Sequence, residues 1–312
     1  MPASCLVTGG AGFIGSALAR ALLARGDRAR VIDNFFSGKR ENLAEVAKDV
    51  ELVEGDIRDE AALARALAGV ELVFHQAAIP SVPRSLADPI ASHDANATGT
   101  LKVLAAAKKA GARRVIYAAS SSAYGDTPTL PKVETMRPLP LSPYAVSKLA
   151  GEHYCQVYAG AFGLETVSLR YFNVFGPRQD PKSEYAAVIP RFLTSAQAGQ
   201  GVTIYGDGTQ SRDFCFIDNT VEANLAAAAA PGVSGQVFNV ACGTATSLND
   251  VVRLVAEIVG HPVPVTYAPG RVGDVKHSLA DVAAARTRLG YRGAISFAEG
   301  LQRTAAWYAA RR

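Results

Sequence analysis

Residues 6–15 of the chain read LVTGGAGFIG. The apolar run CLVT, residues 5–8, predicts a buried strand, and a helical stretch begins near Ile14. Between them stand Gly9, Gly12 and Gly15, which allow a tight turn, a close backbone approach to a pyrophosphate, and close helix–strand packing. The amino end of the following helix favours the same anion. This strand–turn–helix unit predicts a dinucleotide site at the start of an α/β fold.

Further short apolar runs alternate with alanine-rich helical stretches up to about Arg170. The strand candidates are residues 30–33, 50–56, 70–75, 114–120 and 165–170, and the helix candidates are 14–26, 60–69 and 99–111. Continuous apolar strands separated by helices are typical of a parallel sheet that is covered on both faces. The pattern therefore predicts a Rossmann-like, doubly wound sheet.

The alternation breaks after Arg170. We expect helices near 187–198, 248–259 and 297–310 and a strand within 202–208; a helix at 219–230 and a strand at 237–241 return to the sheet. This arrangement predicts a dinucleotide-binding domain over 1–170, with the return at 217–241. A smaller carboxyl-terminal lobe is expected from 171–216 and 242–312.

The composition excludes several classes of partner. The 312 residues carry 32 basic and 28 acidic side chains that are scattered along the chain, so we expect no nucleic-acid stripe. No stretch approaches the roughly 20 apolar residues of a membrane span. The start, MPASCLVTGG, enters structure directly, so no signal peptide is expected. The four cysteines form no CxxC pair, which favours a reduced, cytoplasmic protein.

Asp33 ends the second predicted strand. A carboxylate at this place can accept both adenosine ribose hydroxyls and repels a 2′-phosphate, which favours NAD over NADP. Lys39 and Arg40, which follow closely, leave NADP open.

PYAVSK, residues 143–148, places Tyr144 and Lys148 one helical turn apart, after Ser142 as the expected N-cap. Tyrosine has a pKa near 10, and a neighbouring ammonium and a positively charged nicotinamide both favour its phenolate. AASSSAYGD, 118–126, brings serines to the carboxyl edge of the sheet. Taken alone, YxxxK is also typical of an ordinary helix start.

The five histidines show no ligand spacing, and His75 is expected in the core. We assign no metal.

Together these motifs resemble the extended short-chain dehydrogenase/reductases, in particular nucleotide-sugar epimerases of the UDP-galactose 4-epimerase type and their UDP-N-acetylglucosamine 4-epimerase branch. The matching segments extend from about residue 8 to 275. They are TGGAGFIG, DNFFSGKRENL, GDIRD, HQAA, SSSAYGD, SPYAVSK, RYFNVFGPRQ, YGDG, SRDF and RVGD.

The resemblance implies a role for individual residues. It makes Tyr144 the catalytic base, Lys148 its electrostatic partner and ribose anchor, and Ser122 the third catalytic member. The implied NAD-binding residues are Gly9, Gly12, Phe13, Ile14, Gly15, Asp33, Asn34, Ser37, Gly38, Asp56, Ile57, Gln76, Ala77, Ala78, Asn96, Ser120, Tyr144, Lys148 and Tyr171. The implied UDP-sugar-binding residues are Ser81, Ser122, Tyr144, Asn173, Ala187, Val188, Thr203, Ile204, Tyr205, Arg212, Arg271, Asp274 and Ser278. Pro80 departs from the family, many members of which have a lysine there that contacts the cofactor.

The resemblance also bears on the reaction. Related dehydratases and decarboxylases carry an acid beside the serine, whereas this chain has Ala123, which favours 4-epimerisation. Ser278 stands where members restricted to non-acetylated sugars often have a tyrosine, so UDP-GlcNAc and UDP-GalNAc are the preferred substrates; Ser278 as an ordinary helix N-cap is the alternative. UDP-glucose/UDP-galactose, UDP-glucuronate, a dehydratase and a non-catalytic NAD-binding regulator stay open. The family implies a homodimer through helices near 91–110 and 143–162.

Overall fold

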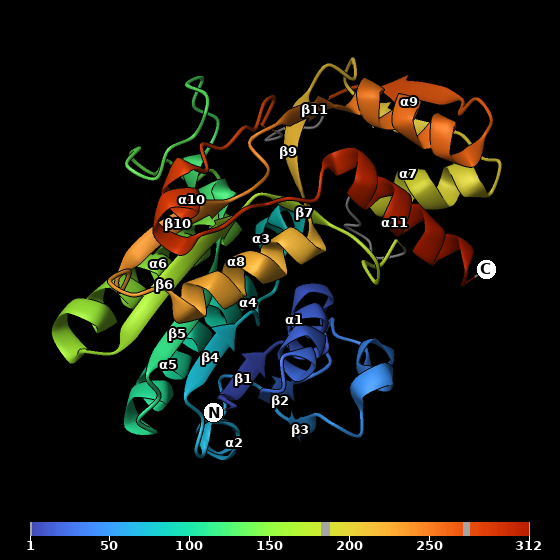
Figure 1. Ribbon diagram of the computed structural model, residues 1–312. Coiled ribbons are helices and arrows are strands. Elements are labelled where there is room, and N and C mark those ends of the chain that lie inside the picture. Colours follow the sequence, from blue (N-terminus) through green and yellow to red (C-terminus); the bar gives the residue numbers. More distant parts are fainter. Residues whose placement is uncertain (1, 182–187, 271–274, 312) are drawn as a thin grey trace.

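The computed structural model describes residues 2–181, 188–270 and 275–311 (Figure 1). Its centre is a seven-stranded sheet with all strands parallel, in the order β10-β6-β5-β4-β1-β2-β3. The strands are β1 (Ser4–Thr8), β2 (Arg28–Asp33), β3 (Glu51–Glu54), β4 (Leu72–His75), β5 (Arg114–Ser120), β6 (Glu165–Tyr171) and β10 (Gln236–Val240). The predicted doubly wound fold is confirmed, and the strand order reverses between β1 and β4.

The central strands β1, β4 and β5 are buried on both faces, which explains their continuous apolar runs. In β1, Leu6 packs into one hydrophobic cluster, while Cys5 and Val7 pack into another on the opposite face. This is the two-residue alternation of a strand with a core on each side.

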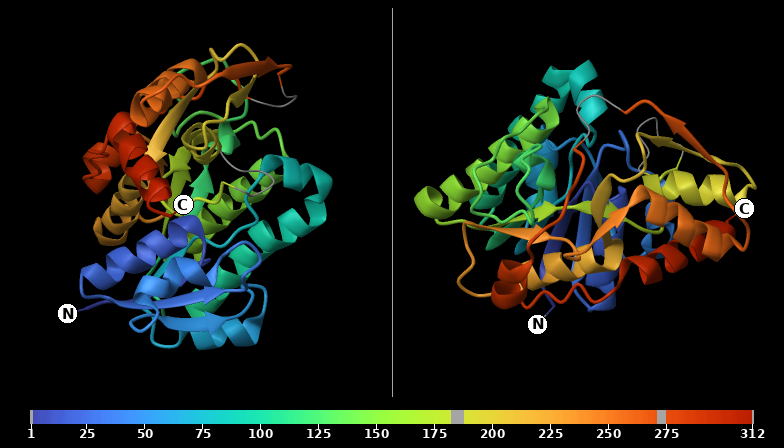
Figure 2. Two further views of the ribbon diagram at one scale, coloured as in Figure 1. Left: turned by 90° about the vertical axis from the view of Figure 1, so that its right-hand side faces the viewer. Right: turned by 90° about the horizontal axis from the view of Figure 1, so that it is seen from above.

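Helices form a layer on each face of the sheet (Figures 1 and 2). One layer contains α2 (Glu60–Leu67), α5 (Gly99–Lys109) and α6 (Pro143–Phe162), and the other contains α1 (Phe13–Ala24), α8 (Ile217–Ala229) and α10 (Ala283–Leu289). The chain reaches α5 through α3 (Val82–Ala87), α4 (Pro89–His93) and a π-helical turn, η2 (Asp94–Thr98). The helix expected near 91–110 is therefore continuous only through a π turn.

The remaining elements lie together beside the carboxyl edge of the sheet, to the right in Figure 1. A three-stranded sheet has the order β11-β9-β7, and a two-stranded sheet pairs β12 with β8. The elements are β7 (Asn173–Phe175), β8 (Val202–Tyr205), β9 (Ser211–Phe216), β11 (Ala245–Ser247), β12 (Val265–Ala268), α7 (Val188–Gln197), α9 (Leu248–Val259) and α11 (Phe297–Ala309). The four strands other than β8 were not predicted.

Three 3₁₀ and π segments complete the described elements: η1 (Arg40–Val46), η2 and η3 (Ser121–Tyr124). The chain returns to the large sheet through α8 and β10, which pairs with β6. The division of the chain into two domains remains a proposal.

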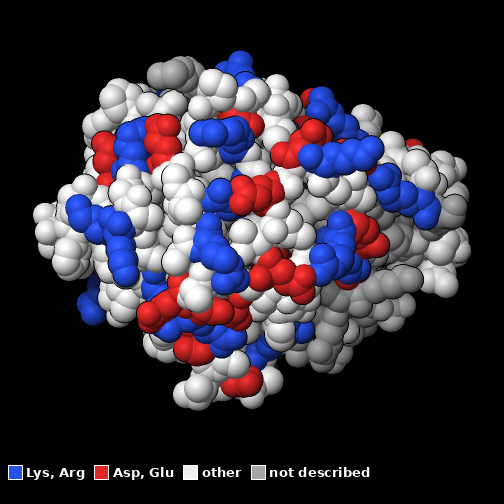
Figure 3. Space-filling view, turned by 90° about the horizontal axis from the view of Figure 1, so that it is seen from below, with Lys and Arg blue, Asp and Glu red and all other residues white. Residues whose placement is uncertain are grey.

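One face of the molecule carries charged side chains of both signs. In the view from below, Lys and Arg lie among Asp and Glu, without a broad area of either sign (Figure 3). Such a face has no extended basic field of the kind that attracts nucleic acid. None of the helices within the described ranges has both the length and the apolar character needed to cross a bilayer.

Candidate active site

The glycine loop is too tightly packed for side chains. Gly9 has φ +65°, and a Cβ there would lie 2.8 Å from the backbone of Ala77. A Cβ on Gly15 would lie 2.2 Å from the Gly9 carbonyl oxygen. The loop leads into α1, where Gly12 is the N-cap and makes no side-chain cap, so no side chain occupies the amino end of the helix. The loop has the shape and dipole that a pyrophosphate requires.

Asp33 lies at the end of β2 and is buried. Its Oδ2 accepts the Ala11 N–H at 2.9 Å, and its Oδ1 accepts the Phe35 N–H at 2.8 Å. Burial raises the pKa of this carboxyl, and the two backbone hydrogen bonds oppose the rise. Because each carboxylate oxygen has a second acceptor position, Asp33 can still accept ribose hydroxyls.

Lys39 and Arg40, the two cations that could favour NADP, each form an ion pair with a carboxylate. Lys39 Nζ lies 2.9 Å from Asp180, and this hydrogen bond raises the lysine pKa. Arg40 pairs with Glu54 and lies over the Phe35 ring, 4.2 Å from its centroid. Phe35 has φ 56°, a left-handed conformation that is unusual for an aromatic residue. Neither cation forms an ion pair with Asp33, so the carboxylate sets the local charge.

A polar network contains two of the predicted NAD-binding residues, Asn34 and Asp56. Asp56 accepts hydrogen bonds from Arg58 and from Asn34 Nδ2, and the Arg58 bonds lower the Asp56 pKa to about 2. Arg58 also bonds Asp94 at 2.6 Å. Ile57 is buried between them. The network therefore connects the segments that follow β2 and β3 with η2.

His75 lies in the core, as predicted, and its tautomer follows from its neighbours. Thr8 Oγ1 accepts the N–H groups of Gln76 and Ala77 at 3.1 Å each, so its own proton goes to His75 Nδ1 at 2.7 Å. The Nε2–H then donates to Thr100 Oγ1 at 2.9 Å. Burial lowers the His75 pKa to about 3, which keeps the ring neutral. This chain of bonds fixes the backbone after β4, where Gln76, Ala77 and Ala78 were predicted to line the cofactor.

The Asn96 side chain forms hydrogen bonds to other residues of the protein. Its Oδ1 accepts the Ile79 N–H at 2.7 Å, and its Nδ2 donates to the Ile79 carbonyl and to Ser147 Oγ, each at 3.1 Å. Asn96 lies in the π turn, and such turns are frequent at functional sites. The side chain therefore supports the segment that follows β4 against the helix carrying Tyr144.

Tyr171 and Gln76 share a hydrogen-bond partner, Asn224, that was not predicted from the sequence. Asn224 of α8 bonds the Tyr171 hydroxyl at 2.7 Å and Gln76 Nε2 at 3.2 Å. The Tyr171 hydroxyl also donates to Gln76 Oε1 at 3.2 Å. Asn224 stands among alanines on a buried helix, which gives no periodic signal of a site.

Tyr144 and the serine run meet at the carboxyl end of β5. Ser122 Oγ donates to Ser120 Oγ at 2.8 Å, and Ser120 forms a hydrogen bond with Tyr144. Burial raises the Tyr144 pKa, and the Ser120 bond opposes the rise. The net shift is therefore upward, opposite to the lowering that the sequence predicts. Ser120, expected only at the cofactor, is the serine that contacts Tyr144 here.

Lys148 is buried beneath the same site. Its Nζ donates to the Ala118 carbonyl at 2.8 Å and lies 5.2 Å from the Tyr117 ring centroid. Burial lowers the Lys148 pKa to about 8, so the ammonium still predominates at neutral pH. As predicted, Ser142 caps α6 by accepting the Ala145 N–H at 3.1 Å, which sets where Tyr144 and Lys148 fall on the helix.

Several of the predicted UDP-sugar-binding residues lie on the smaller sheets. Asn173 begins β7 and donates to the Asp213 carbonyl at 3.3 Å. Arg212, on β9, donates to the carbonyls of Ser211 and Lys276. Val188 begins α7, and β8 contains Thr203, Ile204 and Tyr205. Ala187, Arg271 and Asp274 lie outside the described residues.

Ser278 does not begin a helix, so the helix-cap alternative is wrong. α10 begins at Ala283, and the Ser278 N–H donates to the Ser211 carbonyl at 3.0 Å. The residue is therefore placed beside β9, next to Arg212.

A contact joins the segments that follow β2 and β4. The Arg84 guanidinium of α3 lies over the Phe36 ring, 5.3 Å from its centroid. Ser81 caps α3 by accepting the Arg84 N–H at 3.2 Å and has φ 127°, a strained value. Because β1 lies between β4 and β2, this contact passes beyond the carboxyl end of β1.

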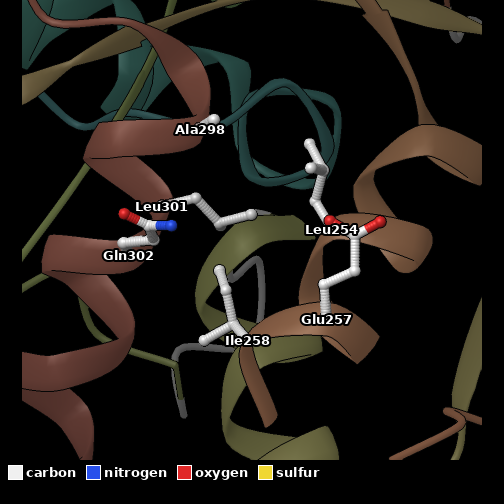
Figure 4. A pocket seen from close by; sticks show the side chains of 6 residues that line it. All are labelled: Leu254, Glu257, Ile258, Ala298, Leu301 and Gln302. Atoms are coloured by element: carbon white, nitrogen blue, oxygen red, sulfur yellow. The ribbon is translucent and has the colours of Figure 1, made fainter. Parts of the chain in front are cut away.

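Two hollows on the surface lie away from these residues. One, of about 110 Å³, lies between α9 and α11 and is lined by Leu254, Glu257, Ile258, Ala298, Leu301 and Gln302 (Figure 4). The other, of about 430 Å³, lies near the amino ends of β1 and β2 and includes Asp27, Arg28 and Glu51. Neither contains a predicted site residue. Within the described ranges no group of three or more His, Cys, Asp or Glu could hold a metal ion.

A doubly wound sheet with a glycine loop, an acidic ribose site and a Ser–Tyr–Lys group at one edge defines an enzyme of the short-chain dehydrogenase/reductase class. The chain belongs to the NAD dependent epimerase/dehydratase family, whose model matches residues 5–241.

Full-length relatives agree with this membership. The chain is 40% identical to a UDP-glucose 4-epimerase of Mycolicibacterium smegmatis, covering 97% of each chain. It is similar to a UDP-N-acetylglucosamine 4-epimerase structure from Methanobrevibacter ruminantium M1, in complex with UDP-N-acetylmuramic acid (TM-score 0.95, 38% identity, 100% of each chain). It is also similar to a UDP-glucose 4-epimerase structure with UDP-glucose from Thermotoga maritima (TM-score 0.94, 37% identity, 99% of each chain).

These findings confirm the resemblance, the fold class, NAD as the cofactor and the prediction of an isomerase. The residues present fit NAD: the loop at Gly9 and Gly15 leaves no space for a Cβ, and Asp33 keeps acceptor positions. The role of each single residue remains a proposal.

Proposed function

We propose that the protein is an NAD-dependent UDP-sugar 4-epimerase that prefers UDP-GlcNAc and UDP-GalNAc. The observation that carries the proposal is the hydrogen-bonded Ser122–Ser120–Tyr144 group above the buried Lys148, at the same sheet edge as the glycine loop. This arrangement provides a proton acceptor beside the place where a nicotinamide would lie.

The proposed reaction transfers one proton and one hydride, and each residue has a separate role in it. Tyr144 accepts the proton of the sugar 4-hydroxyl and later returns it, and Ser122 holds that hydroxyl by a hydrogen bond. Lys148 keeps positive charge beneath the phenolate and anchors the nicotinamide ribose. NAD would be held by the glycine loop and Asp33; it would supply the acceptor for the C4 hydride and would return that hydride to the other face of the rotated 4-keto sugar, with no net redox change.

The absence of an acid beside the serine supports simple epimerisation. Ala123 is buried where related dehydratases and decarboxylases carry a carboxylate. Epimerisation removes no proton from C5, so it has no use for that acid. A dehydratase is therefore a less favoured alternative. A UDP-glucuronate epimerase is less favoured for another reason, because members specific for that substrate tend to have threonine where Asn173 stands here.

Ser278 supports the choice of an N-acetylated sugar. It lies beside Ser211 and Arg212, on the side where the sugar nucleotide is proposed to bind, and its small side chain leaves room at C2. The similar structures cited above include a UDP-N-acetylglucosamine 4-epimerase and a UDP-glucose 4-epimerase. UDP-glucose/UDP-galactose is the alternative substrate pair.

The direct test incubates the purified protein separately with UDP-GalNAc, UDP-galactose and UDP-glucuronate and separates the products by chromatography. We expect UDP-GlcNAc to form fastest and UDP-glucose to form more slowly. Conversion of none of the three would refute the epimerase; conversion of UDP-galactose alone would refute the preference.

Ser278→Tyr tests the C2 assignment. A rigid ring at this position overlaps the volume of an N-acetyl group but not that of a hydroxyl, so it acts against one substrate class. We expect kcat/KM for UDP-GlcNAc to fall at least about tenfold, or roughly 1.4 kcal/mol, with UDP-glucose as the internal control. Equal losses on both sugars would show a general disturbance of the lobe.

We further propose that the protein acts as a cytoplasmic homodimer. Its four cysteines are all free thiols, as expected for a reducing compartment. Apolar side chains are exposed on two adjacent helices: Ile90 of α4 (78% exposed), Val146 (48%) and Val157 (51%) of α6. Exposed apolar side chains on neighbouring helices favour a subunit interface.

A further inference from the structure

Asp213 of β9 is a completely buried carboxylate that has only backbone partners. Its Oδ1 accepts the Cys242 N–H at 2.9 Å, and its Oδ2 accepts those of Gly243 at 3.0 Å and Ala280 at 3.2 Å. The Thr244 N–H is a further donor. No Lys or Arg of the described chain forms an ion pair with it. The residue is 0% exposed.

An uncompensated buried charge is unfavourable. Burial raises the Asp213 pKa to about 6, and the four backbone hydrogen bonds oppose this rise only in part. A neutral side chain would avoid the desolvation of the carboxylate but could not accept N–H groups from four directions. The four donors come from two separate segments, and this geometry requires a carboxylate.

The segments that Asp213 holds carry the proposed sugar-nucleotide residues. Residues 242–244 follow the end of β10, and Ala280 comes two residues after Ser278. The Asp213 carbonyl accepts the Asn173 amide, which joins β7 to the same point. Arg212 is the preceding residue, and its guanidinium reaches the Lys276 carbonyl at 3.0 Å. One residue therefore connects β7, β9, the end of β10 and the segment around Ser278.

We propose that Asp213 is a positioning residue of the nucleotide-sugar site: its carboxylate sets the placement of β9 against residues 242–244 and 278–280, so that Arg212 and Asn173 face the diphosphate. The inference rests on the proposed function. Asp213 contacts no reacting atom, so it acts on binding of the UDP moiety and not on proton transfer at Tyr144.

The test replaces Asp213 by asparagine, which keeps the shape but turns an acceptor into a donor that opposes the backbone N–H groups. Asp207→Asn is the matched control, since Asp207 lies in the exposed turn before β9 and its side chain bonds only Thr209. Binding of UDP alone is measured by titration calorimetry, bound NAD by extraction and chromatography, and kinetics with UDP-GalNAc.

We expect Asp213→Asn to weaken UDP binding and raise KM by at least about tenfold, with kcat within about twofold and NAD content unchanged. Asp207→Asn should match the parent protein. Unchanged UDP binding in Asp213→Asn would overturn the inference, as would parallel losses of NAD and UDP, which indicate a general structural role. If the parent protein binds no UDP, the proposed function fails first and the inference fails with it.

A measurement on the unaltered protein covers the case in which Asp213→Asn does not fold. Hydrogen exchange of the amides of residues 242–244 and 280 is followed with and without UDP. If Asp213 couples these segments to the UDP site, bound UDP slows their exchange at least about fivefold, while exchange in α2, on the far side of the sheet, stays the same. Equal rates in both states would overturn the inference.

Discussion

At the scale of single residues, Tyr144 is buried, and burial opposes the negative charge of the phenolate that its proposed role requires. Burial raises its pKa, and only the Ser120 hydrogen bond works in the other direction. Lys148 lies one turn along α6, but its Nζ donates to the Ala118 carbonyl. Burial therefore favours the neutral phenol, and the proposed role of Tyr144 requires positive charge near its hydroxyl, from Lys148 and from a bound NAD.

Tyr144→Phe removes the proton acceptor and little else. We expect kcat to fall by about 10² or more, while NAD content and UDP affinity stay unchanged. Tyr154→Phe on the same helix is the control, because Tyr154 is exposed, and it should keep full activity. Near-normal turnover by Tyr144→Phe would exclude the proposed mechanism.

His75 predicts a specific loss of stability in acid. Its pKa is lower in the folded chain than in the unfolded chain, because burial favours the neutral ring. The unfolded chain therefore takes up the proton first, and the contribution of His75 is complete above about pH 6.5 and is lost as the pH falls.

His75→Gln tests this linkage, since glutamine can hydrogen-bond but does not titrate. From pH 7 to pH 5, the parent protein should lose about 2 kcal/mol more of its free energy of unfolding than the variant loses. Urea unfolding at both pH values provides the measurement. Equal losses in the two proteins would show that His75 is not the titrating group.

Sequence patterns indicated the residues that belong to motifs, and no others. Gly9, Asp33 and Lys148 stand at fixed offsets from strand ends and helix starts, so their places followed from the predicted elements. Asn224 and Asp213 have partners that are 29 to 148 residues away along the chain, and no local pattern records such pairings. Their roles depend on the tertiary arrangement.

At the scale of elements, a buried ion pair joins α6, the helix that carries Tyr144 and Lys148, to the sheet. Arg170 of β6 donates to both oxygens of Glu152 of α6, at 2.9 and 2.6 Å, and both side chains are almost completely buried. The Arg170 guanidinium also lies 4.6 Å from the Tyr124 ring centroid. Glu152 is one turn beyond Lys148, so the pair sets the rotation of α6 relative to β6.

Glu152→Gln should destabilise the protein by about 3–5 kcal/mol, because Arg170 is left as a buried charge without its partner. The control is Glu257→Gln, which breaks the exposed Arg253–Glu257 pair and should change stability by less than about 0.5 kcal/mol. Replacing both Glu152 and Arg170 by methionine should recover part of the loss. A double variant as unstable as the single one would show that the pair is not the cause.

Long elements were predictable and short ones were not. The central strands β1, β4 and β5 of the large sheet contain continuous apolar runs, and α6 begins at a clear Ser-Pro signal. β7 and β11 have three residues each, and β9 begins with Ser211, Arg212 and Asp213. β9 depends on β7, on β11 and on the Asp213 hydrogen bonds, none of which shows as a local periodicity.

At the scale of the whole molecule, the exposed apolar residues of α4 and α6 predict self-association. We expect sedimentation to give the mass of a dimer, and Ile90→Glu combined with Val157→Glu to give a monomer, because charge cannot be buried without a partner. Leu52→Glu on the edge strand β3 is the control, since Leu52 is also an exposed apolar residue but lies at the other end of the sheet. A dimer that persists in the double variant would place the interface elsewhere.

The contact of Phe36 with Arg84 bears on how long the enzyme retains its nucleotide. Because the two residues join beyond the carboxyl end of β1, we expect this contact to cover part of a nucleotide lying along the glycine loop and to slow its release. We expect the nucleotide to have a long residence time and to survive dilution and gel filtration. An isomerase that returns its hydride in each turnover and keeps its nucleotide is insulated from the surrounding NAD⁺/NADH ratio, so it can interconvert sugars at the same rate in a well-aerated cell and in one deprived of oxygen.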